Sequence, residues 1–257
     1  MKRALKVLAV GVLLVLAVPV ALLVEAFTGN PPIPDGKKIA EGVEVIKDGH
    51  VSVFLLDAGE GQVALVDAGN DPEGKAILKA LERRKLGPDA VRAIFLTHGH
   101  RDHTAGAHLF RGAEVMALGP DVRLAQGEVK GRAPLTRWFP PNDQPAQVTR
   151  VVKDGETVRV GNLEVQVYSV PGHTPGSAVY LARNVLFFGD SADARKDGRL
   201  VAAKWIFTDD ARKNRAMLKI FAQRMELHAP EIHALAFAHT GVLDGSKPLF
   251  DFAAQAK

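Results

Sequence analysis

A run of metal-binding side chains directly after an apolar strand constrains this chain more than any other feature of its sequence. The stretch Phe95–Gly106, FLTHGHRDHTAG, places three histidines and an aspartate within six positions. His98 and His100 are two residues apart, so they point the same way if the backbone is extended. Asp102 and His103 follow where a helix is expected to start, and the turn can fold them back toward the first pair. Four imidazole and carboxylate groups at one strand end suit one or two divalent ions such as zinc.

Residues of the same kind follow four other expected strands. His173 lies in VPGHTPGS, Asp190 in FFGDS, His239 in FAHTG and Asp67 in LVDAG. A single histidine or aspartate at a strand end is usually a turn residue, but five such strand ends beside glycines are hard to explain by chance. The chain contains no cysteine, so any metal must be held by histidines and carboxylates.

The order of expected elements indicates a layered α/β domain. Short β-branched or continuous apolar runs bounded by turns predict strands, and apolar residues at helical spacing predict two helices. The expected strands are 43–46, 51–56, 62–66, 91–96, 148–152, 157–160, 163–170, 178–182, 185–188 and 232–238. The expected helices are 71–86 and 209–227. This mixture of hairpins and strand–helix–strand units fits two sheets with helices outside them.

These motifs, in this order, resemble those of the metallo-β-lactamase-fold hydrolase superfamily. The resemblance covers roughly residues 42–241 and implies a four-layer αβ/βα sandwich with metals at one edge of the sheets. It implies that His98, His100 and His173 bind a first metal. Asp102, His103 and His239 would bind a second, and Asp190 would bridge the two. Asp67 would orient the histidine loop from behind the ligands.

The resemblance also implies a reaction in which two metals activate a water to hydroxide, which attacks an ester, thioester or lactone. Asp102 and Asp190 are then the candidate catalytic residues. Zinc is the expected metal, with iron or manganese as alternatives. Because Asp190 is present and cysteine is absent, the hydrolase pattern resembles the glyoxalase II-like and lactonase-like branches rather than true β-lactamases. It lacks the tyrosine after the bridging acid that bacterial lactonases use.

Two other functions stay open. A single-iron persulfide dioxygenase shares the HxHxDH segment but needs only one metal, and His239 argues against it. A metal-stabilised binding module without catalysis is the other alternative, which the complete ligand set argues against.

Two irregular or inserted stretches are candidates for the walls of a pocket for a small-molecule substrate. Residues 119–147 show no periodicity, and a loop this long in a compact domain is usually functional or disordered. The candidate pocket residues are Arg132, Arg137, Trp138, Lys204 and Trp205. Four other histidines match no motif and are expected to be structural or solvated: His50, His108, His228 and His233.

The first 27 residues predict a membrane anchor or a cleaved signal peptide. MKRALK is basic, and Val7–Val24 is an apolar run of 18 residues. Either interpretation sends the domain across a bacterial-type inner membrane, to be anchored facing the periplasm or released after cleavage. Residues 28–41 are expected to be a linker and 42–257 the catalytic domain. About half of the net charge of +4 lies in the first 25 residues, so no nucleic-acid partner is expected.

Overall fold

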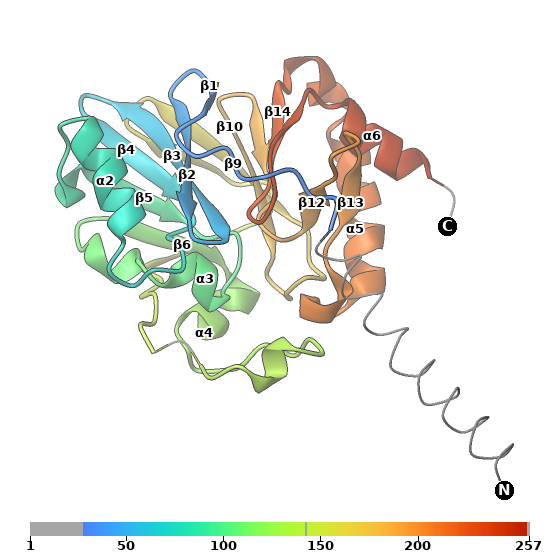
Figure 1. The fold of residues 1–257 in the computed structure, drawn as a ribbon, viewed down its shortest axis with the longest axis horizontal. Helices are drawn as coiled ribbons and strands as arrows, with labels where there is room; N and C mark the ends of the chain where they lie inside the picture. Colours follow the sequence, from blue (N-terminus) through green and yellow to red (C-terminus); the bar gives the residue numbers. More distant parts are fainter. Residues whose placement is uncertain (1–27, 142, 256–257) are drawn as a thin grey trace, which may run out of the picture. The chain divides into compact units, whose positions relative to one another are not determined.

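Two β-sheets form the centre of the computed structural model, which describes residues 28–141 and 143–255 (Figure 1). The first sheet has seven strands, antiparallel from β1 to β4 and parallel from β4 to β7. In sheet order these are β1 (Lys38–Ala40), β2 (Val43–Asp48), β3 (Val51–Gly59), β4 (Gln62–Val66), β5 (Val91–Phe95), β6 (Glu114–Leu118) and β7 (Arg150–Val152).

The second sheet has six strands, antiparallel except for the pair β11 and β14. In sheet order these are β15 (Leu243–Asp244), β14 (Ala234–Ala236), β11 (Val185–Phe187), β10 (Ala178–Ala182), β9 (Leu163–Ser169) and β8 (Thr157–Val160). A separate hairpin pairs β12 (Ala192–Ala194) with β13 (Leu200–Ala202).

Alternating side chains of each strand fill different apolar layers. In β3, Phe54 and Leu56 pack between the two sheets, whereas Val53 and Leu55 pack on the outer side of the first sheet. The central layer joins residues of both sheets, for example Phe54 and Phe187, whose rings are 5.0 Å apart.

Helices cover the two outer faces. Ile77, Ala80 and Leu81 of α2 (Lys75–Arg83) pack on the first sheet. Leu218 of α5 (Ala211–Arg224) and Phe252 of α6 (Lys247–Ala254) pack on the second sheet (Figure 1). Two shorter helices lie beside the first sheet, α3 (Arg101–Thr104) and α4 (Val122–Ala125). The predicted four-layer αβ/βα sandwich is therefore confirmed.

The elements differ from the sequence-based expectation in detail. The first helix starts at Lys75 rather than at Asp71, because the Asp71 carboxylate accepts from the main-chain N–H groups of Glu73 and Lys75 in the turn before the helix. Five strands and two helices were not expected: β1, β6, β12, β13, β15, α4 and α6. The irregular stretch 119–147 contains only single helical turns, among them Thr136–Trp138.

The predicted linker is wrong for most of its length. Residues from Pro31 onward belong to the same compact unit as the sheets, and β1 pairs with β2. Ile33 and Ile39 pack against the central layer, and the Gly241 N–H donates to the Pro31 carbonyl at 3.0 Å. Apolar contacts and strand pairing thus hold a segment whose prolines and glycines suggested a free connection.

The predicted anchor or signal peptide, residues 1–27, lies outside the described residues. Within residues 28–141 and 143–255, none of the helices has the length and apolar character needed to cross a membrane.

Candidate metal centre

The seven predicted ligands meet at one edge of the two sheets, where five strands end. The strand-end residues that follow β4, β5, β9, β11 and β14 are Asp67, His98, His173, Asp190 and His239. All five strands run in the same direction within their sheets, so their carboxyl ends lie together. The short helix α3 adds Asp102 and His103.

Three histidines form what we call the first metal group: His98, His100 and His173. The distance from His98 Nε2 to His100 Nδ1 is 3.0 Å, and His173 Nε2 lies 3.2 Å and 3.1 Å from those two atoms. Two nitrogen ligands of a tetrahedral zinc ion, each about 2.0–2.1 Å from the metal, are roughly 3.3 Å apart. The three nitrogens therefore have the spacing of ligands to one ion.

Hydroxyl groups set the tautomers of two of these rings. Thr97 Oγ1 donates to the Asp67 carboxylate at 2.8 Å, so at 3.2 Å it accepts from His98 Nδ1. Thr208 Oγ1 donates to the Lys204 carbonyl at 2.7 Å, so at 3.3 Å it accepts from His173 Nδ1. Both Nε2 atoms then carry lone pairs that face each other, an arrangement that a cation between them would stabilise.

The second metal group consists of Asp102, His103 and His239. Asp102 Oδ2 lies 3.4 Å from His239 Nε2 and 3.8 Å from His103 Nε2. The Nδ1 atoms of both histidines are held by oxygens, at 2.7 Å by Asp67 Oδ2 and at 2.9 Å by the His50 carbonyl. Both Nε2 atoms therefore face the carboxylates.

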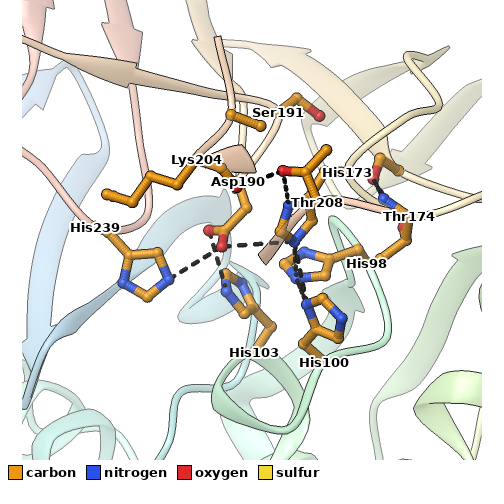
Figure 2. A network of polar contacts seen from close by, with 12 residues as sticks. His98, His100, His103, His173, Thr174, Asp190, Ser191, Lys204, Thr208 and His239 are labelled. Carbon is orange, nitrogen blue, oxygen red and sulfur yellow. Dashed lines mark hydrogen bonds and ion pairs between the residues drawn. The ribbon is translucent and has the colours of Figure 1, made fainter. Parts of the chain in front are cut away.

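Asp190 lies between the two groups, as Figure 2 shows. Its Oδ1 is 3.3 Å from His103 Nε2, and its Oδ2 is 3.2 Å from His239 Nε2 and 3.6 Å from His173 Nε2. His103 Nε2 and Asp190 Oδ1 are buried and make no hydrogen bond of good geometry. A cation between such atoms would satisfy them. The residues thus fit two divalent ions bridged by Asp190.

The two metal groups differ in charge. Burial lowers the pKa of all three histidines of the first group, that of His173 to about 3. Burial also opposes the charged form of His103 and His239, but nearby carboxylates outweigh it. Asp67, Asp102 and Asp190 raise the pKa of His103 well above its usual value, and Asp190 and Asp102 raise that of His239 to about 10.

The pKa values of Asp102 and Asp190 are lowered, whereas those of the neighbouring His103 and His239 are raised. Burial alone would raise the pKa of Asp102 and Asp190, but the neighbouring histidines hold both well below the usual range. Both side chains are therefore ionised at neutral pH, as metal ligands must be.

Asp67, for which a supporting role was predicted, lies behind the candidate ligands and contacts them. It is fully buried, and its left-handed backbone (φ 62°) turns the chain sharply at the end of β4. Its carboxylate accepts from Thr97 N at 2.7 Å, as well as from Thr97 Oγ1 and His103 Nδ1. One side chain thereby orients ligands of both metal groups.

Asp121, which the sequence analysis missed, has the corresponding role for the first metal group. Its buried carboxylate accepts from Gly99 N at 2.8 Å, Thr174 Oγ1 at 2.7 Å and Gly176 N at 2.6 Å. These residues flank the three histidines in sequence, so Asp121 joins the two loops that hold them. An aspartate after Gly119-Pro120 at the end of β6 was the available signal, but β6 itself was not expected.

Three more residues near the ligands were also missed. Asn214 of α5 is buried, donates to the Ser191 carbonyl at 3.0 Å and accepts from Ala203 N at 3.1 Å, so it holds the chain after Asp190. Thr208 and His50 contact ligands as described above. No short motif marks Thr208 or Asn214.

The predicted pocket residues lie on two segments that are bonded to each other. Leu135 N donates to the Ile206 carbonyl and Arg132 N to Asp209 Oδ1, both at 3.0 Å. Asp209 N in turn donates to the His173 carbonyl at 3.0 Å. A Cβ atom added at Gly131 would lie 3.2 Å from His100 Nε2, so the long loop passes close to the first metal group.

The side chains of the predicted pocket differ in their contacts. Arg137 Nε donates to the Ala133 carbonyl at 3.1 Å, and Lys204 Nζ donates to Asp193 Oδ2 at 2.7 Å, so these cations have protein partners. Trp138 and Trp205 are 78% and 46% exposed. The substrate-binding role of all five residues stays a prediction.

The chain belongs to the metallo-beta-lactamase superfamily, whose family model matches residues 46–236. It is 32% identical over 148 residues to a hydroxyacylglutathione hydrolase from Salmonella paratyphi A, and equally to one from Citrobacter koseri. Each match covers 58% of this chain and 49% of the relative, so the match extends over about half the length of these curated relatives.

Solved structures of low sequence identity share the fold. A B3 metallo-beta-lactamase with an active-site glutamic acid has a TM-score of 0.66 at 21% identity, covering 86% of this chain and 87% of its own. The B3 enzyme BJP-1 of Bradyrhizobium japonicum has a TM-score of 0.60 at 19% identity, covering 83% and 81%. Family membership supports the prediction of a hydrolase.

Replacing Asp121 by asparagine is expected to weaken the first metal group. Three donors face the carboxylate, so an asparagine NH₂ must oppose at least one of them. Losing such a supporting contact typically costs about 10–100-fold in metal affinity. Chelator competition on the Asp121→Asn protein measures this, with the exposed Asp89→Asn as control. Unchanged affinity would show that Asp121 does not position these ligands.

Metal at the second group is expected to be lost before metal at the first as the pH falls from about 8 to about 5. A proton competes with metal for His239, whose pKa is raised to about 10, and for His103, whose pKa is also raised. The histidines of the first group have lowered pKa values and stay unprotonated over this range. Metal content after dialysis at each pH tests this order, and simultaneous loss of both ions would contradict it.

Proposed function

We propose that this protein is a dinuclear metal-dependent hydrolase of a small ester, thioester or lactone. The observation that carries the proposal is the position of Asp190, whose two oxygens face different sets of histidine nitrogens. Zinc suits the imidazole-rich donor set, and iron or manganese would also accept these ligands.

Bound divalent ions would supply a water of lowered pKa and positive charge for the oxyanion that develops on the substrate carbonyl. Asp190 would hold both ions, and Asp102 would complete the second group. Because their pKa values lie well below the usual range, these two carboxylates act as anionic ligands and acceptors rather than as proton donors at neutral pH.

The other polar groups of the site fix the orientation of the histidine rings. Thr97, Thr208 and Asp67 accept hydrogen bonds from Nδ1 of His98, His173 and His103, so that the Nε2 atom of each ring faces inward. No cysteine is available as a nucleophile anywhere in the chain, which agrees with attack by a water-derived hydroxide.

The class of substrate is supported by the relatives. Those named hydroxyacylglutathione hydrolase act, by their name, on an acyl derivative of glutathione, and the structural neighbours are named β-lactamases. Both names describe hydrolysis at an acyl carbon. The match extends over only about half of the former relatives, so glutathione itself is not carried over to this chain.

A single-iron persulfide dioxygenase and a non-catalytic binding module are the competing proposals. The first would not need Asp102 and His239 as ligands, yet both lie within 3.4 Å of each other beside Asp190. The second would not need buried ligands with unsatisfied polar atoms, which are costly to maintain.

The place of action remains a proposal that rests on the sequence of residues 1–27. Their basic start and apolar run support an anchored or exported protein that meets its small-molecule substrate beyond the inner membrane. The low net charge of the rest supports the absence of a nucleic-acid partner.

The decisive experiment combines metal analysis with a substrate panel. The purified protein should contain two metal ions per chain and hydrolyse at least one member of a thioester, ester and lactone panel. His100→Ala should lose bound metal and activity together, at least about 10³-fold in kcat/KM, while the exposed His233→Ala keeps both. Full activity of metal-free protein would refute the proposal. β-Lactam or phosphodiester hydrolysis would reassign the substrate, and oxygen uptake with a persulfide would favour the dioxygenase.

Trp138 and Trp205, exposed on the two segments that are bonded to each other beside the first metal group, are expected to contact the apolar part of the substrate. Trp138→Ala and Trp205→Ala should each raise KM about three- to tenfold with little change in kcat or metal content. Ile220→Ala, an exposed apolar side chain on α5, is the matched control. Loss of metal or a lower melting temperature in the tryptophan variants would instead assign these rings to holding the loop.

A further inference from the structure

His50 lies in the turn between β2 and β3, and no motif in the sequence singled it out. Its side chain is 63% exposed, yet its Nε2 atom lies 3.4 Å from Asp102 Oδ2. Its ring is parallel to that of His239, with a 5.5 Å centroid separation and a 4° interplanar angle. Its carbonyl accepts from His239 Nδ1 at 2.9 Å. One residue therefore contacts two members of the second metal group, through both its main chain and its side chain.

The turn that carries His50 is held on both sides. Asp48 Oδ2 accepts from Asn70 N at 2.7 Å and from Asp71 N at 2.8 Å, just after Asp67. On the other side, Ser52 N donates to the Ala238 carbonyl at 2.7 Å, directly before His239. These bonds fix the backbone at His50 relative to both the strand end of β4 and the strand end of β14.

The donor atoms of His50, Asp102 and His239 lie within 4.8 Å of one another. A histidine in contact with solvent alone would not be expected to stack on one candidate metal ligand while its Nε2 atom faces another. The other unassigned histidines differ in this respect. His108 Nδ1 contacts the Ala105 carbonyl in its own turn, and His228 lies 4.0 Å from Glu231.

We infer that His50 is a positioning residue of the second metal group: its carbonyl sets the tautomer of His239, and its imidazole orients the Asp102 carboxylate. The Nε2–H of His50 is directed at Oδ2, the oxygen that also faces His103 and His239, so the imidazole holds the Asp102 carboxylate in its orientation toward the second metal group. The stacked ring restricts the rotation of His239. The inference rests on the proposed two-metal function, because it concerns the affinity of the second ion.

The test is a metal titration that resolves two binding steps. Purified metal-free protein is titrated with Co²⁺, and the two dissociation constants are obtained from calorimetry and from the absorption bands of each bound ion. His50→Ala should weaken the second step about 10–100-fold and leave the first within about twofold. His50→Gln, which keeps a donor that can reach Asp102, should restore most of the loss. The control is His233→Ala.

Because each variant keeps the main-chain carbonyl of residue 50, the tautomer of His239 is preserved, and the experiment isolates the ring. The inference would be overturned if the dissociation constant of the second Co²⁺ ion were the same in His50→Ala as in the wild type. This result would leave the two-metal function intact. A wild-type protein that binds only one ion would overturn the two-metal function itself. Equal weakening of both steps, with no rescue by glutamine, would indicate a general disturbance of the turn and also overturn the role assigned to His50.

Discussion

The rest of the site depends on the hydrogen bonds that the buried carboxylate of Asp67 accepts. Asp67 lies at the end of β4 in a left-handed backbone conformation and accepts three hydrogen bonds, from Thr97 N, Thr97 Oγ1 and His103 Nδ1. Through Thr97 it fixes His98 in the first metal group, and through His103 it reaches the second. The space beside this contact is closed: a Cβ at Gly189 would lie 2.3 Å from Thr97 Oγ1. The residue before Asp190 must therefore be glycine for the bridging acid to approach the histidine loop this closely.

The sandwich explains why residues far apart in sequence can form one centre. Each sheet supplies strands whose carboxyl ends meet at the same edge, and neither sheet alone carries a complete ligand set. The apolar layer between the sheets fixes their relative position through large buried rings such as Phe54 and Phe187. Tightly packed interiors transmit small displacements. The spacing of the candidate ligand atoms therefore depends on packing that lies well away from these atoms.

The candidate ligands could be recognised in the sequence because each is marked locally, by a strand end, a glycine or the HxHxDH spacing. Asp121 and His50 could not, since their roles arise from contacts with Thr174 and His239 that span 53 and 189 residues. Thr208 illustrates the same limit, because a single hydroxyl in an irregular stretch carries no pattern. The linker prediction failed for a related reason. Prolines and glycines describe local backbone preference, whereas the place of β1 in the sheet is decided by its pairing with β2 and by Ile33 and Ile39 against the core.

The structure also indicates that the stability of the fold does not depend mainly on bound metal. Small zinc domains unfold without their ion because the metal supplies most of their stabilisation. Here three apolar clusters pack between and outside the sheets, and the ligands sit at the edge of these layers rather than within them. Bonds from Asp67, Asp121, Thr208 and His50 hold the ligands in position from within the protein. The unfavourable approach of the nitrogen lone pairs in the first metal group is therefore maintained by the fold, and a bound cation would relieve it. Such preorganisation favours metal affinity over metal-dependent folding, which suits a catalytic centre whose ligands must keep their geometry throughout turnover.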